Sequence, residues 1–144
     1  MKNYWVFPIT EDNHLVCLKH KVVGAKKNNP RIFQVKYGDI ILFYISRMYL
    51  NKMGYPVKQF HSVVQCNGPS YEAARDSIDI FGSVYSQHLP IKIINRKKCD
   101  IKPLINKLSF IKNKENWGSS FLSGMRKISK SDYDIILNAF DDKL

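Results

Sequence analysis

The run Ile40-Ile-Leu-Phe-Tyr-Ile45 is the longest uninterrupted apolar stretch of the chain, at six residues. A strand with no polar residue on either face is typical of the middle of a sheet that is covered on both sides. The run is far too short to cross a bilayer as a helix, which takes roughly 20 residues. We therefore expect a central strand at residues 40–45 and no membrane span.

The residues before this run predict a strand, a helix and a chain reversal. Residues 4–7 are aromatic and β-branched, and they predict a first strand that ends at Pro8, because proline has no backbone donor. Polar residues suited to cap a helix come next, and a short helix is expected with Leu15 and Leu18 on one side. Gly24 is expected to close this unit, since glycine tolerates the left-handed backbone of a chain reversal.

The residues after the run predict a hairpin and a second strand. Turn-forming residues between positions 46 and 56 predict the hairpin connection. Residues 57–66 then predict a strand with Phe60, Val64 and Cys66 on one face.

The second half of the chain predicts one more strand and three helices. A surface helix is expected within residues 71–81, a half-buried strand at 89–95, and a short helix after Pro103. Ser129, followed by Asp132 three residues later, predicts a capped last helix. This order predicts a single α+β domain over residues 1–144, built as a curved mixed sheet or small partial barrel packed by helices.

Charge and cysteine usage bound the function. Twenty-three Lys and Arg against 12 Asp and Glu give a formal net charge of +11, an excess that suits an anionic partner. Without a membrane span or a signal-peptide pattern, nucleic acid is the expected partner. Cys17, Cys66 and Cys99 show no pairing pattern, which predicts reduced thiols and a cytoplasmic location.

Sequence motifs of catalysis are absent. The chain has no glycine-rich phosphate loop, no Gly-x-Ser-x-Gly and no His-Glu-x-x-His. His14, Cys17 and His20 are spaced by three, but over that span helical side chains diverge by about 120°. We therefore expect no metal site, no cofactor and no catalysed reaction.

Trp117 is the most informative aromatic residue of the sequence. It lies in a polar segment near Lys112, Lys114 and Arg126. A tryptophan in such a place is either a plug over the core or a wall of a ligand pocket, and an exposed one suits stacking on a nucleic-acid base.

Several segments together resemble one known family. In order, they are Asn3-Tyr-Trp-Val-Phe, Glu11-Asp-Asn-His, Val23-Gly-Ala, Val35-Lys-Tyr-Gly-Asp-Ile-Ile-Leu-Phe-Tyr, Lys102-Pro-Leu-Ile-Asn-Lys-Leu-Ser-Phe-Ile-Lys-Asn-Lys-Glu-Asn-Trp and Gly124-Met-Arg-Lys-Ile-Ser-Lys-Ser-Asp-Tyr. The chain resembles EVE-domain proteins of the small stand-alone prokaryotic type, the UPF0310 group. The resemblance covers nearly the whole chain apart from residues 67–88.

This resemblance implies a PUA-like pseudo-barrel of about five to six strands with flanking helices. It also implies a relation to YTH domains, which read methylated adenine in RNA within an aromatic cage, and to EVE domains associated with modified cytosine in DNA. The chain departs from the family pattern at Val23 and His14, where most relatives have Trp. An aromatic wall at these positions is therefore lost or is supplied by Trp117 or Tyr44.

The hypothesis that follows is a flipped or single-stranded base in a pocket, with its phosphates on basic side chains. The expected ligand-binding residues are Thr10, Asn13, Val23, Gly24, Ala25, Tyr44, Trp117 and Ser119. The expected phosphate-binding residues are Lys26, Lys27, Arg31, Lys36, Lys112, Lys114 and Arg126. The chain is expected to be a monomer or a weak dimer.

Two alternatives stay open at this stage. ASCH domains share the PUA-like fold, and some hydrolyse RNA or modified nucleosides; Thr10, Glu11 and Lys26 are the candidate residues for such a reaction. The third possibility is a protein-interaction module.

Overall fold

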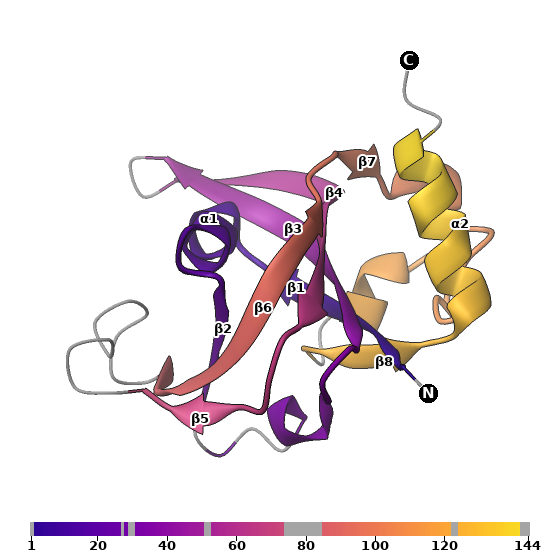
Figure 1. Cartoon of the computed structure of the whole chain (residues 1–144). Coiled ribbons are helices and arrows are strands. Elements are labelled where there is room, and N and C mark those ends of the chain that lie inside the picture. Colours follow the sequence, from indigo (N-terminus) through magenta and orange to yellow (C-terminus); the bar gives the residue numbers. More distant parts are fainter. Residues whose placement is uncertain are drawn as a thin grey trace.

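The computed structural model describes residues 2–26, 28, 31–50, 53–73, 85–121 and 124–141. Strand β3 (Ile40–Leu50) lies in the middle of the sheet, antiparallel to β4 (Met53–Cys66) and parallel to β1 (Tyr4–Ile9). The expected central strand is thus confirmed. The sheet follows the order β2-β6-β4-β3-β1-β8, with β5 paired to β6 and β7 paired to β4 (Figure 1).

The remaining elements complete a curled, mixed half-barrel. They are α1 (Glu11–His20), β2 (Val22–Ala25), β5 (Tyr71–Glu72), β6 (Gln87–Asn95), β7 (Cys99–Asp100), β8 (Arg126–Ile128) and α2 (Lys130–Asp141). Helices α1 and α2 lie on opposite sides of the sheet (Figure 1). None of the described helices has the length and apolar character that a bilayer crossing requires.

Two apolar clusters pack against the two faces of the sheet, and β3 contributes to both. Leu42 and Tyr44 belong to the cluster under α2, whereas Ile41 and Phe43 belong to the cluster under α1. Alternation along an extended strand sends neighbouring side chains to opposite faces, so a strand apolar at every position feeds two cores. This arrangement is the physical reason that residues 40–45 carry no polar residue.

The first helical unit differs from its prediction in three places. Strand β1 continues through Pro8 to Ile9. Leu15 is 48% exposed, because α1 lies on the sheet through His14, Cys17 and Leu18 instead. The helix ends at His20 and is capped by Lys21, whose φ of 56° is left-handed, whereas Gly24 lies inside β2 and pairs with His88.

The hairpin after the central strand is tighter than predicted. Its strands continue to Leu50 and restart at Met53, and Asn51 lies outside the described residues. In β4, the register shifts between the pairs Phe43–Ser62 and Tyr44–Phe60, so His61 is the extra residue of a β-bulge. The bulge reverses the alternation, and Phe60 therefore belongs to the α2-side cluster while Val64 and Cys66 belong to the α1-side cluster.

The C-terminal predictions hold in part. The strand expected at residues 89–95 is β6, and Asp132 N donates to Ser129 Oγ at 3.1 Å as the cap predicts. Tyr71 lies in β5 and not in a helix, and residues 74–81 of that prediction lie outside the described part. The helix expected after Pro103 is a short 3-10 helix, Lys102–Leu104.

Asp39 does more than close a turn. Its buried carboxylate accepts hydrogen bonds from Asn3 N at 2.9 Å, Lys36 N at 3.0 Å and Trp5 Nε1 at 3.1 Å. A buried carboxylate needs such donors because water is excluded from it. Asp39 thereby fixes the start of β1 to the turn that leads into β3.

Candidate functional site

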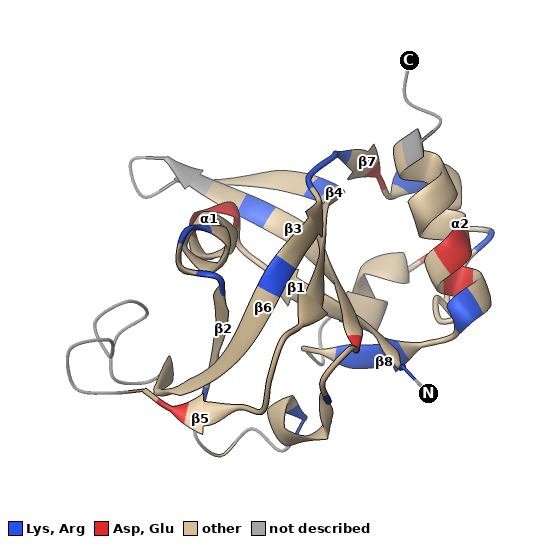
Figure 2. Ribbon diagram, viewed as in Figure 1, with Lys and Arg blue, Asp and Glu red and all other residues tan. Residues whose placement is uncertain are grey.

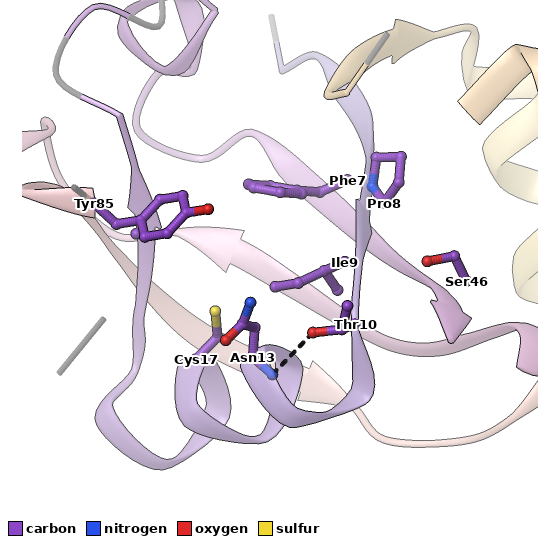
Figure 3. Close-up of a pocket in the computed structure, with 9 residues that line it drawn as sticks. Phe7, Pro8, Ile9, Thr10, Asn13, Cys17, Ser46 and Tyr85 are labelled. Atoms are coloured by element: carbon purple, nitrogen blue, oxygen red, sulfur yellow. Dashed lines mark hydrogen bonds between the residues drawn. The ribbon is translucent and has the colours of Figure 1, made fainter. Parts of the chain in front are cut away.

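An open pocket of about 300 Å³ lies where β1 leads into α1. Its walls are mostly apolar, and the rings of Phe7, from β1, and Tyr85, which lies just before β6, extend into it (Figure 3). Ser46 of β3 and Gly24 of β2 complete its sides. The volume is at the lower end of the range for small-molecule sites, about 300–1,000 Å³. We call this space the α1 pocket.

Polar groups of the α1 pocket come from the first turn of α1. Thr10 is the N-cap, and its Oγ1 accepts a hydrogen bond from Asn13 N at 3.4 Å. The side-chain amide of Asn13 makes no hydrogen bond to any described residue, and it lies between Cys17 and Thr10 at the pocket edge (Figure 3). Burial raises the pKa of Cys17 to about 12, so its thiol stays protonated and is a poor nucleophile. The site thus offers stacking surfaces and an amide donor and acceptor.

A second pocket of about 320 Å³ contains Trp117 and Tyr44. It shares Pro8 of β1 and Ser46 of β3 with the α1 pocket, so the two hollows adjoin there. Trp117 is half-buried, and it contacts the core through an edge-on ring contact with Phe121 at 6.4 Å. We call this space the Trp117 pocket.

Basic side chains line the Trp117 pocket. Lys58 Nζ lies 5.5 Å from the Trp117 ring centroid, and Arg47 lines the same wall. Lys58 has a left-handed φ of 57° at an irregular point of β4, where the pairing with β3 also shifts. Such a conformation is costly for a residue with a Cβ, and it directs the ammonium group over the indole.

The structure divides the expected ligand-binding residues among several places. Thr10, Asn13 and Gly24 line the α1 pocket, and Tyr44 and Trp117 line the adjoining one. The other three lie elsewhere: Val23 and Ala25 are buried in the α1-side core, and the Ser119 hydroxyl donates to Asn116 O.

The expected phosphate-binding residues are divided as well. Arg31 donates to Met125 O, Arg126 donates to Ser120 O, and Lys114 donates to Ile105 O and Leu108 O. These cations satisfy backbone carbonyls, which gives them a structural role. Lys26, Lys36 and Lys112 are exposed, and Lys27 lies outside the described residues. Figure 2 shows Lys and Arg on both helices and on several strands, so the positive charge is not confined to one face.

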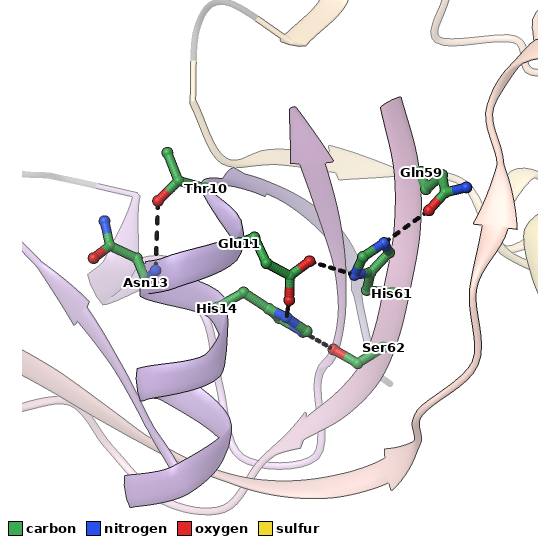
Figure 4. A network of polar contacts seen from close by, with 7 residues as sticks. All are labelled: Thr10, Glu11, Asn13, His14, Gln59, His61 and Ser62. Atoms are coloured by element: carbon green, nitrogen blue, oxygen red, sulfur yellow. Dashed lines mark hydrogen bonds and ion pairs between the residues drawn. The ribbon is translucent and has the colours of Figure 1, made fainter. Parts of the chain in front are cut away.

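A compact polar cluster lies on the other side of the same helical turn. The carboxylate of Glu11 contacts His61 Nδ1 at 2.8 Å and His14 Nδ1 at 3.6 Å (Figure 4). Both histidines are buried, and burial followed by the charges of His61 and Arg96 lowers the pKa of His14 from 6.5 to about 4. Burial also raises the pKa of Glu11, although Lys98 opposes this effect. The cluster was not expected from the sequence, which gave His61 no distinguishing signal.

Sequence reasoning also missed the two aromatic walls of the α1 pocket. Phe7 belongs to the predicted first strand, and it lies against Phe43 of the core, at 5.9 Å between ring centroids. Its other surface faces the pocket. Tyr85 belongs to the segment outside the family resemblance, where no periodic pattern singled it out.

Comparison with known proteins places this geometry in a family. No protein-family model matches the chain. The chain is 31% identical to a UPF0310 protein of Pyrococcus horikoshii, with 92% of this chain and 95% of the relative covered. It is 30% identical to a UPF0310 protein of Pyrococcus abyssi, over 93% and 96% of the two chains.

Solved structures confirm the expected PUA-like fold. The YTH domain of Zygosaccharomyces rouxii MRB1, in complex with N6-methyladenosine RNA, matches with a TM-score of 0.68 at 15% identity, over 99% of this chain and 89% of that one. Human THYN1, in complex with 5-methylcytosine DNA, matches with a TM-score of 0.59 at 9% identity, over 99% and 100%. Identity and coverage over nearly the full length of two curated relatives make the chain a member of the UPF0310 family.

Proposed function

We propose that the protein binds single-stranded or locally opened nucleic acid and accommodates one base, in particular a modified base, in the α1 pocket. The observation that carries this proposal is the pairing of two aromatic walls, Phe7 and Tyr85, with the unbonded amide of Asn13. Aromatic faces stack on any base at about 1–3 kcal/mol each, and an amide reads the hydrogen-bonding edge. The protein acts as a binding module and catalyses no reaction of its own.

The fold supports a modified base as the ligand. A YTH domain bound to N6-methyladenosine RNA and THYN1 bound to 5-methylcytosine DNA share this architecture. A methyl group on a base adds apolar surface, which suits a pocket whose walls are mainly Phe7, Pro8 and Ile9.

The Trp117 pocket extends the proposed path of the strand. Because Pro8 and Ser46 belong to both pockets, a nucleotide next to the bound base would lie over Trp117. Arg47 and Lys58 would then contact its phosphate, a role in which cations position the strand without reading its sequence.

The hydrolase alternative receives less support from the geometry. Thr10 opens to the α1 pocket, whereas Glu11 contacts His14 and His61 on the other side of the helix. Lys26 follows β2 and lines neither the α1 pocket nor the space beside Glu11, His14 and His61. A nucleophile, an acid and a cation therefore do not converge on one reacting atom.

Fluorescence anisotropy with short oligonucleotides tests the proposal. Matched RNA and DNA strands carry one central base, either unmodified or as N6-methyladenine or 5-methylcytosine. We expect Tyr85→Ala to weaken binding by about 5- to 150-fold, the equivalent of the roughly 1–3 kcal/mol of one stacking contact.

Tyr71→Ala is the matched control. Tyr71 is 43% exposed, close to the 38% of Tyr85, but it lies on β5 and lines neither pocket. Equal losses in the two variants, or no loss in Tyr85→Ala, would contradict a base in the α1 pocket.

A further inference from the structure

The Glu11 cluster has features that base binding does not use. Glu11 and His14 come from the first turn of α1, and His61 comes from β4 (Figure 4). Within the described residues these three form one group whose ligand-type atoms all lie within 4.8 Å of one another. A small hollow of about 260 Å³ opens beside them.

The β-bulge at His61 creates this arrangement. In a regular strand, consecutive side chains point to opposite faces of the sheet. Here both His61 and Ser62 reach α1: His61 contacts Glu11, and Ser62 Oγ lies 2.8 Å from His14 Nε2. The extra residue of the bulge is what allows two neighbouring positions to serve one cluster.

The outer nitrogens of both imidazoles are held by oxygen atoms. His14 Nε2 faces Ser62 Oγ at 2.8 Å, and His61 Nε2 faces Gln59 Oε1 at 2.9 Å. A protonated Nε2 that donates to these oxygens leaves the Nδ1 lone pair of each ring directed at the Glu11 carboxylate. Metal-binding histidines have this arrangement, with the second nitrogen oriented by a hydrogen bond.

Two lone pairs and a carboxylate that face one another require a positive charge between them. A proton on His61 Nδ1 satisfies the 2.8 Å contact with Glu11. His14 Nδ1 has no hydrogen-bond partner among the described residues, its distance to Glu11 is 3.6 Å, and the residue is only 2% exposed. A buried nitrogen left in this state is costly unless an ion completes it.

We propose that Glu11, His14 and His61 bind a divalent transition-metal ion of the zinc type. Tetrahedral zinc with ligand bonds of about 2.0–2.1 Å places its ligand atoms about 3.3 Å apart. The three atoms need to close by about 1.5 Å at most, and the His61–Glu11 contact needs to open by about 0.5 Å. Binding displaces the proton from His61 Nδ1 to solvent and leaves one coordination position open to the hollow.

Positive side chains beside the proposed metal site affect its affinity for a cation. Arg96, Lys97 and Lys98 line the same hollow. Their charge lowers affinity for a bare cation and favours an anionic fourth ligand such as hydroxide, which reduces the net charge of the complex.

Calorimetric titration of the chelator-treated full chain with Zn²⁺ tests the proposal. We expect one ion per chain and a loss of affinity of at least about 10-fold in both Glu11→Gln and His61→Gln, since even outer-shell partners are worth about 10- to 100-fold. His20→Gln is the control, because His20 is exposed on the same helix. No binding by the wild-type chain, or a loss confined to His20→Gln, overturns the proposal.

A second measurement needs no variant. The chain has four histidines, so their imidazole resonances can be followed individually while Co²⁺ is added. Strong paramagnetic shifts of His14 and His61, with weak effects on His20 and His88, are expected. Shifts centred on His20 or His88 instead would exclude this site as the metal centre.

Discussion

The first turn of α1 separates two sites of opposite character. Thr10 and Asn13 open to a pocket with aromatic walls, whereas Glu11 and His14 enter a buried cluster of ionisable groups. Residues three apart share a helix face and adjacent residues are about 100° apart, so the two pairs diverge from one another. The same short segment, residues 10–14, thereby contributes to two sites of different chemistry.

The difference comes from what each face meets. Asn13 lines a pocket with mostly apolar walls, and its amide makes no hydrogen bond to a described residue. Glu11 and His14 meet His61 and Ser62, which the bulge turns toward them. The position of a residue around the helix determines which side of α1 it faces. The residues of the opposing strand then determine whether its polar groups find partners within the protein.

The largest effect is expected in acid, on the cluster side. His14 has a folded-state pKa of about 4 against an ordinary value of 6.5, so the unfolded chain takes up this proton first. Its contribution to stability is complete above about pH 6.5 and is lost as the pH falls toward 4, by about 3 kcal/mol at most. Urea unfolding in chelator-containing buffers across this window measures the loss.

His14→Gln isolates this contribution. Glu11 acts in the opposite sense, because burial raises its pKa and thereby favours the folded state in acid. The variant keeps Glu11 but removes the imidazole, so its stability should decline less between pH 6.5 and 4. An unchanged pH dependence in the variant would mean that the two faces of α1 do not differ in this way.

The sequence predicts those elements in which local pattern and tertiary packing agree. Residues 40–45 are apolar throughout because both faces of β3 are covered, and Ser129 caps α2 through a contact within one turn. Prediction from the sequence fails at the bulge around His61, because an extra residue in a strand does not change the kinds of residue that the strand contains. Lys21 likewise adopts a left-handed conformation. A glycine at this position would have indicated that conformation in the sequence, but a lysine does not.

The next effect concerns the aromatic walls of the α1 pocket. The family resemblance implies Trp where this chain has Val23, but Val23 is 0% exposed and lies in the core behind the pocket. We expect Val23→Trp to overpack this core, lowering the free energy of unfolding by about 1–3 kcal/mol, without a gain in oligonucleotide affinity. Chemical unfolding and anisotropy measure the two quantities.

Ile94→Trp controls for the added indole. Ile94 is 49% exposed on β6 and has room for a larger ring. Tighter oligonucleotide binding by Val23→Trp, but not by Ile94→Trp, would show that the pocket wall extends to position 23. Position 23 would then belong to the binding site and not only to the core.

The candidate site was harder to predict than the fold. The family resemblance implied Thr10 and Asn13 at the pocket, and both line the α1 pocket in the structure. Tyr85 reaches the pocket from the segment before β6, distant in sequence, and Phe7 contacts both the core and the pocket. Neither role leaves a periodic pattern that a single sequence displays.

A smaller effect is expected from the cations of the Trp117 pocket. Arg47 and Lys58 are exposed there, and no described carboxylate pairs with either. If each contacts one phosphate, the double variant Arg47→Gln/Lys58→Gln should flatten the dependence of log affinity on log salt by about 1.4 for single strands. Anisotropy titrations at several salt concentrations measure this slope.

Lys92→Gln/Lys107→Gln is the control pair for that slope, because both lysines are exposed and line none of the hollows described above. Equal flattening in the two double variants would indicate that binding depends on overall charge. The strand would then not follow the path from the α1 pocket to Trp117.

The smallest expected effect tests the amide that distinguishes the open face of α1. The Asn13 side chain makes no hydrogen bond to the described residues, and its backbone bond to Thr10 persists in Asn13→Ala. Stability should therefore be unchanged, while base binding loses a hydrogen bond of about 0.5–1.5 kcal/mol, or roughly 2- to 12-fold. Asn138→Ala, at an exposed position of α2, is the control for loss of a helical amide. If Asn13→Ala lost stability but not affinity, the Asn13 amide would serve the protein's own structure, as the Glu11 carboxylate does. The α1 pocket would then have no helical side chain that hydrogen-bonds to the edge of a base.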